Sequence, residues 1–165
     1  MARSGKLDKV DWRILQELQN DARITNVELA RRAGISPPPC LRRVRALEEA
    51  GLIEGYRAVL SSDKLGFEVT MFAMIGLHSQ AESDLMAFDE YVSAAPIVRE
   101  VYMLSGEIDF LLKCVAHDIH AVQDFVGQLT ALPNVANVKT RLMLRATKYE
   151  PGVPVELVDP ETDGG

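Results

Sequence analysis

The stretch SPPPCLRRVRAL, residues 36–47, predicts a short helix with arginines on one side and apolar residues on the other. Ser36 is a good N-cap, because its hydroxyl can accept a backbone N–H of the first turn. Pro37 suits the first helical position, where its missing N–H costs nothing. Another short helical pattern ends just upstream, at Gly34. Two helices joined by a tight glycine-containing turn, the second one bearing arginines, are typical of a helix-turn-helix that reads DNA.

The surrounding sequence extends this pair into a domain. We expect a winged helix-turn-helix over residues 1–60, with the helix-turn-helix itself at about 26–45. Apolar residues at helical spacing predict a first helix over residues 8–21. Thr25 and Glu28 have the spacing of a capping box, which predicts the start of the second helix.

The third helix has two different faces when its residues are placed at 100° per residue. The side that docks on the other helices is expected to carry Cys40, Leu41, Val44 and Leu47. The outward side is expected to carry Pro38, Pro39, Arg42, Arg43 and Ala46, with Arg45 at its edge. After this helix, residues 52–60 fit a small two-stranded wing.

Residues 67–150 have a different rhythm, in which apolar strand patterns alternate with helical ones. Their order is β-α-β-β-α-β, which predicts a ferredoxin-like domain and therefore an α+β fold for the chain. The expected strands are residues 67–78, 98–104, 110–115 and 135–145, and the expected helices are residues 81–95 and 119–132. Residues 61–66 are expected to form a linker, and the acidic residues 151–165, rich in Pro and Gly, predict a loosely held tail.

Both faces of the first of these strands are apolar. Met71, Ala73 and Ile75 point to one side, and Phe72 and Met74 point to the other. Two helices can cover only one face of a four-stranded sheet, so the uncovered face needs a partner. A second copy of the chain is the simplest partner, and we predict a dimer built through this domain.

Composition and charge bound the class of protein. The 165 residues are 47% hydrophobic and 25% charged, which is typical of a soluble globular protein. No apolar run approaches the roughly 20 residues of a membrane helix, and the start of the chain lacks a secretion pattern. Two cysteines make no disulfide framework, so we expect a reducing cytoplasm. The net charge of −6 divides into +3 for residues 1–60 and −9 for residues 61–165, which indicates two modules with different partners.

Three segments together resemble the Lrp/AsnC (leucine-responsive regulatory protein) family: residues 7–60, LSGEIDFLLK at 104–113 and LPNVANVKTR at 132–141. The resemblance implies a winged helix-turn-helix followed by an α/β domain that senses a small effector, commonly an amino acid. It also implies dimers that assemble into tetramers, octamers or larger rings. Two residues depart from the family pattern. Pro38 replaces a threonine, and Arg42 stands where the relatives closest to the leucine-responsive protein often have an acidic residue, so we expect this helix to read a DNA site of its own.

The candidate DNA contacts lie on and around the third helix. Arg42 is the best candidate for base readout, since arginine pairs bidentately with guanine. Arg43 and Arg45 are candidates for phosphate contacts, and the alternative is that these arginines form an ordinary solvated helix face. The full set of residues expected at the DNA is Asn26, Ser36, Pro38, Arg42, Arg43, Arg45 and Arg57.

The segment SGEID that begins at Ser105 is the candidate effector site. Its simplest interpretation is a turn between strands in which Gly106 supplies an unusual φ. The resemblance instead implies that the effector binds this turn, in a cleft between subunits. Exposed N–H groups of the turn would hold a carboxylate, and Asp109 would hold an α-amino group. Arg141 and Met143 share a strand face and would line the cleft from a neighbouring subunit, which would favour an acidic or polar amino acid over leucine, unless Arg141 is a plain surface cation.

Other reactive side chains have simpler interpretations. Cys40 and Cys114 are expected to be buried structural thiols rather than redox sensors. His117 and His120 flank Asp118, a candidate helix cap, and no third metal ligand is apparent, so we expect no metal site. No motif frames a catalytic nucleophile, and we expect neither catalytic residues nor a cofactor.

These observations predict a cytoplasmic, sequence-specific transcriptional regulator rather than an enzyme. Its expected partners are double-stranded operator DNA, a small effector, and further copies of itself as a dimer and then a tetramer or octamer. The effector would act by changing the relative stability of the oligomeric states. The alternative is an amino-acid-binding metabolic enzyme or an enzyme-regulatory module, because a βαββαβ domain alone does not determine function. The basic N-terminal module favours the regulator.

Overall fold

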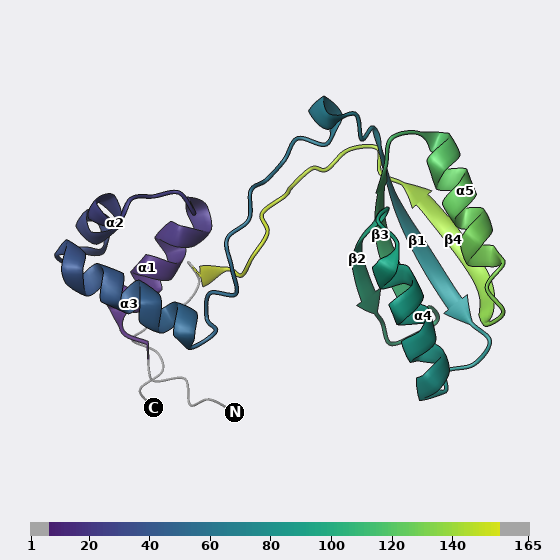
Figure 1. Ribbon diagram of the computed structural model, residues 1–165, viewed down its shortest axis with the longest axis horizontal. Helices are drawn as coiled ribbons and strands as arrows, with labels where there is room; N and C mark the ends of the chain where they lie inside the picture. The colour runs from purple at the N-terminus through teal and green to yellow at the C-terminus, as the bar shows by residue number, and fades with distance from the viewer. Residues whose placement is uncertain (1–6, 156–165) are drawn as a thin grey trace. The chain divides into compact units, whose positions relative to one another are not determined.

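The computed structural model describes residues 7–155, which form two compact units (Figure 1). The first, the helical unit, combines residues 7–59 with residues 149–155, and the second, the sheet unit, is Leu60–Lys148. The break after Val59 lies one residue before the expected end of the DNA-binding domain. Part of the expected acidic tail, residues 156–165, lies outside the described residues.

Three helices make up the helical unit: α1 (Lys9–Asn20), α2 (Asn26–Ala33) and α3 (Pro37–Glu49). The carboxylate of Asp8 caps α1, and the hydroxyl of Thr25 caps α2 by accepting the N–H of Glu28. Gly34 ends α2 in the left-handed conformation, at φ +72°. The expected helix-turn-helix is therefore confirmed. Its fully buried core consists of Ile14, Leu29, Ala30, Cys40 and Leu47.

The start of α3 differs from the expected N-cap. Ser36 has the extended backbone of an N-cap, but its side chain makes no capping hydrogen bond. The three residues that follow are prolines, which have no N–H, so the first turn offers the hydroxyl no donor. The first N–H of the helix belongs to Cys40, and it donates to the carbonyl oxygen of Ser36 at 3.2 Å. The expectation that the Ser36 hydroxyl caps the helix is therefore wrong.

The expected two-stranded wing is also absent as a hairpin, since residues 52–60 contain no strand. The N–H groups of Leu52 and Ile53 both donate to the carbonyl oxygen of Leu47, which closes the end of α3. Beyond Ile53 the segment is exposed, and Val59 keeps 77% of its surface accessible. Nine residues divided by a turn leave about three for each strand, which is the lower limit of strand length.

Residues 149–155 return to the helical unit and are held there. The side-chain amide of Gln19 donates to the carbonyl oxygen of Val153 at 2.7 Å and accepts its N–H at 3.1 Å. Gly152, at φ +113°, lies against this amide so closely that a Cβ would come within 2.5 Å of the Gln19 Oε1. Val155 is buried at the end of the described chain. The expectation of a loosely held tail is therefore wrong for residues 151–155, because a side chain on α1 bonds both backbone polar groups of Val153 and Val155 is buried.

The sheet unit has the expected β-α-β-β-α-β order. Its four strands form one antiparallel sheet in the spatial order β2-β3-β1-β4. The strands are β1 (Val69–Leu77), β2 (Val98–Met103), β3 (Phe110–Ala116) and β4 (Val135–Leu142), the helices are α4 (Glu82–Ala94) and α5 (Ile119–Thr130), and a short 3-10 helix, η1 (Asp63–Leu65), precedes them. Both long helices pack on the face of the sheet that carries Met71, Ala73 and Ile75 (Figure 1).

The opposite face of the sheet, which we term the open face, carries Phe72 and Met74 of β1. Phe72 pairs in register with Lys113 of β3 and Arg141 of β4, so two cationic side chains flank an aromatic one. Both Phe72 and Met74 are only half-buried in the single chain. The expectation that β1 is apolar on both faces is confirmed, and its open side remains available to a partner.

Candidate DNA-binding surface and effector site

Arg42 and Arg45 are exposed cations of α3. They lie three residues apart, so their side chains leave the helix on the same side. Neither forms an ion pair or a hydrogen bond with any residue of the described chain, 7–155. Leu41 lies next to Arg42 and is 41% exposed, so the expectation that it docks α3 on the other helices is wrong. The docking side consists of Cys40, Val44 and Leu47.

Arg43 has a different role from its two neighbours on α3. Its Nη1 atom lies 2.8 Å from Oδ2 of Asp8 and 2.7 Å from Oδ1 of Asp11, so it joins α3 to the start of α1. These bonds raise the pKa of Arg43, first through Asp11 and then through Asp8. The angular count placed this side chain outward, but it lies near the boundary of the docking side and finds its partners on another helix. Arg43 is therefore already paired with two carboxylates through Nη1, which makes it a weaker candidate for a phosphate contact than an unpaired arginine.

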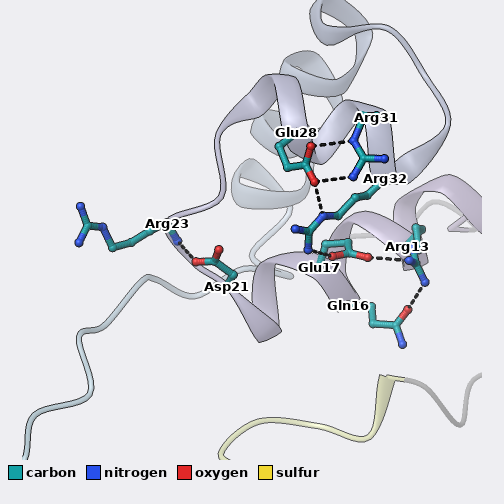
Figure 2. A network of polar contacts seen from close by, with 8 residues as sticks. All are labelled: Arg13, Gln16, Glu17, Asp21, Arg23, Glu28, Arg31 and Arg32. Carbon is teal, nitrogen blue, oxygen red and sulfur yellow. Dashed lines mark hydrogen bonds and ion pairs between the residues drawn. The ribbon is translucent and has the colours of Figure 1, made fainter.

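The other paired arginines form a network between α1 and α2 (Figure 2). Glu17, a buried residue, accepts from Arg13 at 2.7 Å and from Arg32 at 2.9 Å. Glu28 accepts from both Arg31 and Arg32 at 2.7 Å. These two hydrogen-bonded arginines lower the pKa of Glu28 to about 2. This network is not among the features expected from the sequence, although spacings of three and four residues within each helix are the ordinary signal of such ion pairs.

Asn26 faces α3 rather than solvent. Its Nδ2 atom donates to the carbonyl oxygen of Pro37 at 2.9 Å, which joins the first residue of α2 to the first residue of α3. Its Oδ1 atom is buried and has no hydrogen-bond partner among the described residues. The sequence places Asn26 among the residues expected at the DNA, and in the structure its side chain joins the two helices of the helix-turn-helix. Ser36, Pro38 and Arg57 are exposed, as a DNA contact requires.

The candidate effector turn lies between β2 and β3. Ser105 and Gly106 are exposed, and Gly106 adopts φ +125°, a conformation that favours glycine. Asp109 closes the turn: its N–H donates to the carbonyl oxygen of Ile75 at 2.8 Å, and its carbonyl oxygen accepts the N–H of Leu104 at 2.9 Å. The turn therefore lies at the end of the sheet, and the bond from Asp109 to Ile75 fixes its backbone to β1.

Both carboxylate oxygens of Asp109 have partners within the chain. Oδ2 accepts the backbone N–H of Leu77 at 2.7 Å, and Oδ1 accepts the side-chain amide of Gln80 at 2.7 Å. The observed backbone bond goes to the end of β1, 32 residues away in sequence. Gln80 was missed, because no sequence pattern links it to this turn.

Arg141 and Met143 lie away from this turn in the single chain. Arg141 pairs with Phe72 in the β1–β4 register, whereas Asp109 bonds to Ile75, three residues further along β1. Three residues span roughly 10 Å of strand. A single chain therefore does not bring Arg141 and Met143 to the turn. The sequence-based prediction likewise places these two residues in a neighbouring subunit.

The remaining candidates take structural roles. Cys40 and Cys114 are buried free thiols, and burial raises the pKa of Cys114 to about 11. His117 stacks on Phe67, and its Nδ1–H donates to the carbonyl oxygen of Gly66 at 2.7 Å. Asp118 caps α5, as expected. The described part of the chain contains no group of three residues able to hold a metal ion and no helix long and apolar enough to cross a membrane.

Two family models match the chain. The model for winged helix-turn-helix DNA-binding domains matches residues 7–54, and the model for the Lrp/AsnC ligand binding domain matches residues 70–153. Among curated proteins, the leucine-responsive regulatory protein of Rhizobium meliloti is 55% identical over 144 residues, which cover 87% of this chain and 92% of that protein. The leucine-responsive regulatory protein of Escherichia coli is 40% identical over 148 residues, which cover 88% and 90%.

Solved structures agree with these matches. A transcriptional regulator from Neisseria meningitidis, in complex with L-Met, superposes with a TM-score of 0.86 at 35% identity and covers 90% of this chain and 97% of its own. An AsnC family transcriptional regulator from Agrobacterium tumefaciens superposes with a TM-score of 0.85 at 34% identity, with coverages of 91% and 98%. The helical unit and the sheet unit therefore each have a recognised counterpart.

Proposed function

Because the chain belongs to the Lrp/AsnC family of transcriptional regulators, we propose that α3 reads operator DNA and that the turn between β2 and β3 binds a small effector. It is a DNA-binding transcriptional regulator with a ligand-binding domain. Regulation by binding requires no catalytic step, so we propose no enzymatic activity. We also propose that the protein acts in the cytoplasm of a prokaryotic cell, because that is where its chromosomal DNA target would lie.

The DNA proposal depends on a contrast among the arginines of the helical unit. Those at positions 13, 31, 32 and 43 are paired with carboxylates. The side chains of Arg42 and Arg45 on α3, like those of Arg23 and Arg57 outside it, have no partner among residues 7–155. Unpaired cations on one side of a recognition helix are available to DNA at no cost in broken ion pairs. In this proposal Arg42 binds a base edge in the major groove and Arg45 binds a phosphate.

The remaining DNA candidates form two groups: exposed side chains, and side chains that contact another helix. Ser36, Pro38 and Arg57 are exposed, and we propose that they contact the DNA backbone or its immediate surroundings. Arg43 contributes mainly by bracing α3 against α1, and Asn26 by fixing the start of α3 against α2.

Arg42→Ala tests the DNA proposal. On an operator selected from random-sequence DNA, the variant should lose about 1–3 kcal/mol of binding free energy and discriminate less at one base pair. Arg99→Ala, which removes an exposed cation from β2 of the sheet unit, is the matched control. For the unmodified chain, log affinity should fall with log salt at a slope of roughly −0.9 per phosphate contacted. Unchanged operator affinity in Arg42→Ala would contradict the assignment.

For the effector we propose an amino acid, bound at the exposed backbone of Ser105 and Gly106 and at the carboxylate of Asp109. The Neisseria relative was solved in complex with L-Met, which supports this class of ligand. Arg141 and Met143 would complete the site from a neighbouring subunit. Calorimetry with the twenty amino acids tests the proposal, and Asp109→Asn should weaken binding because it removes the negative charge opposite the α-ammonium. Equal affinity in Asp109→Asn would contradict the site.

We also propose that the open face joins two chains and that the effector acts on their assembly. Phe72 and Met74 are half-buried on this face in the single chain, and a second copy would cover them. An effector between subunits changes the assembly only by the difference in its affinity for the oligomeric states. Assembly would then set the spacing of the α3 helices on DNA.

A further inference from the structure

Asp109 has one fixed partner and one exchangeable partner. Oδ2 accepts from the backbone N–H of Leu77, a half-buried group at the end of β1 whose position the sheet determines. Oδ1 accepts from the amide of Gln80, an exposed bond made by a side chain that can rotate away. Only the second bond can be broken without disturbing the sheet. Oδ1 is therefore the atom at which an incoming ligand can replace a partner.

The loop that carries Gln80 is anchored independently of Asp109. The side chain of Asn134, in the turn between α5 and β4, accepts the N–H of Ser79 at 3.0 Å and donates to its carbonyl oxygen at 3.1 Å. The carbonyl oxygen of Asn134 also accepts the N–H of His78 at 2.8 Å. These three bonds fix the backbone just before Gln80. Release of the Gln80 side chain would therefore leave the loop in place.

We infer that the amide of Gln80 occupies, in the ligand-free chain, the position on Asp109 that an amino acid's α-ammonium would take. This inference rests on the effector site proposed above and adds an internal competitor to it. A hydrogen bond between an ammonium and a carboxylate is stronger than one between a neutral amide and a carboxylate, so the ligand displaces Gln80. The displaced bond is lost from the binding free energy, and Gln80 raises the effector concentration at which the site fills.

The bond from Gln80 to Asp109 also affects which ligands the site selects. A ligand without an α-ammonium cannot offer Asp109 a better partner than the amide it already has. Gln80 therefore selects against neutral and N-acylated analogues, in addition to lowering the affinity for free amino acids.

Titration calorimetry on the full chain tests the competition, with L-methionine first and then the other standard amino acids, and with N-acetyl-L-methionine as the analogue that lacks the ammonium. For each amino acid that binds, Gln80→Ala should tighten binding by about 3- to 10-fold, because the competing bond is gone. Gln123→Ala is the matched control, since it removes an exposed glutamine from α5. In the unmodified chain, the side-chain amide resonances of Gln80 should shift on ligand addition while those of Gln123 stay unchanged.

Each outcome separates the inference from the proposed effector site. Equal or weaker binding in Gln80→Ala, in a chain that still binds amino acids, overturns the competition and leaves the site standing. Absence of amino-acid binding in both the unmodified chain and Gln80→Ala overturns the site and the inference together. Binding that appears only in Gln80→Ala supports both.

Discussion

Ser36 has only one of the two properties of an N-cap serine, the backbone conformation and the capping hydrogen bond, because three prolines follow it. The residue has the backbone conformation of a cap, but its hydroxyl has no N–H of the first turn to accept. The hydroxyl is exposed at the start of α3, where a DNA phosphate could use it as a donor. The residue is therefore expected to matter for DNA binding and not for folding.

This separation predicts different results for two N-cap substitutions. Ser36→Ala should change the free energy of unfolding by less than about 0.5 kcal/mol, because no capping bond is lost. Thr25→Ala should lower it by about 1 kcal/mol, because the hydroxyl of Thr25 accepts the N–H of Glu28. Urea unfolding of both variants measures the difference. An equal loss in the two variants would show that Ser36 caps α3 after all.

The carboxylate of Glu28 should make the stability of the fold depend on pH. Hydrogen bonds from Arg31 and Arg32 lower the pKa of Glu28 from 4.5 to about 2 in the folded chain. A lowered pKa in the folded state means that this carboxylate contributes stability above pH about 4.5 and loses it as the pH falls through about 2. Glu28→Gln should therefore reduce stability at pH 7, and the gap from the unmodified chain should narrow towards acid pH. Glu49→Gln, at an exposed position of α3, is the control, and a gap independent of pH would contradict the assignment.

At the scale of elements, Asn26 determines how α2 and α3 are joined. Its amide bonds to the carbonyl oxygen of Pro37, so the angle of the reading helix depends on this contact. Asn26→Ala should lower the free energy of unfolding by at most about 1 kcal/mol, because a hydrogen bond is lost but a buried, unpartnered oxygen is removed as well. The larger effect should appear in the ratio of operator affinity to random-DNA affinity, measured by fluorescence anisotropy. Val27→Ala, at the next and exposed position, is the control, and an unchanged ratio in Asn26→Ala would refute the positioning role.

The elements that the sequence predicts well are those whose signals are local. Caps at Thr25 and Asp118, and a glycine at 34, mark helix ends within a few residues of the groups they satisfy. The failures involve partners distant in sequence. Residues 151–155 are held by Gln19, more than 130 positions away. The carboxylate of Asp109 accepts a bond from Gln80, and a helix and a strand separate these two residues in the sequence. Arg43 belongs to the same class, since an angular count cannot show that its carboxylates lie on another helix.

For the molecule as a whole, the proposed dimer bears directly on DNA reading. One α3 presents only two unpaired arginines, which is a small number of contacts for a specific site. A two-fold dimer would present two such helices to successive major grooves, about 34 Å apart, and double the contacts. If the open face makes the dimer, as we propose, a change on that face should alter operator affinity without touching DNA.

Phe72→Lys tests this dependence. The substitution puts a third cation between Lys113 and Arg141 on the open face, where two copies would have to bury it. The neighbouring carboxylate of Glu100 is already paired with Lys113 at 2.7 Å. We expect the dimer to dissociate at least tenfold more readily in sedimentation velocity across a dilution series, with an unchanged circular dichroism spectrum and weaker operator binding. Met86→Lys adds the same charge at an exposed position of α4, on the other side of the sheet, and should leave both properties unchanged. If Phe72→Lys keeps the mass and the operator affinity of the unmodified chain, the dimer is built through another surface, and the spacing of the α3 helices must be set elsewhere.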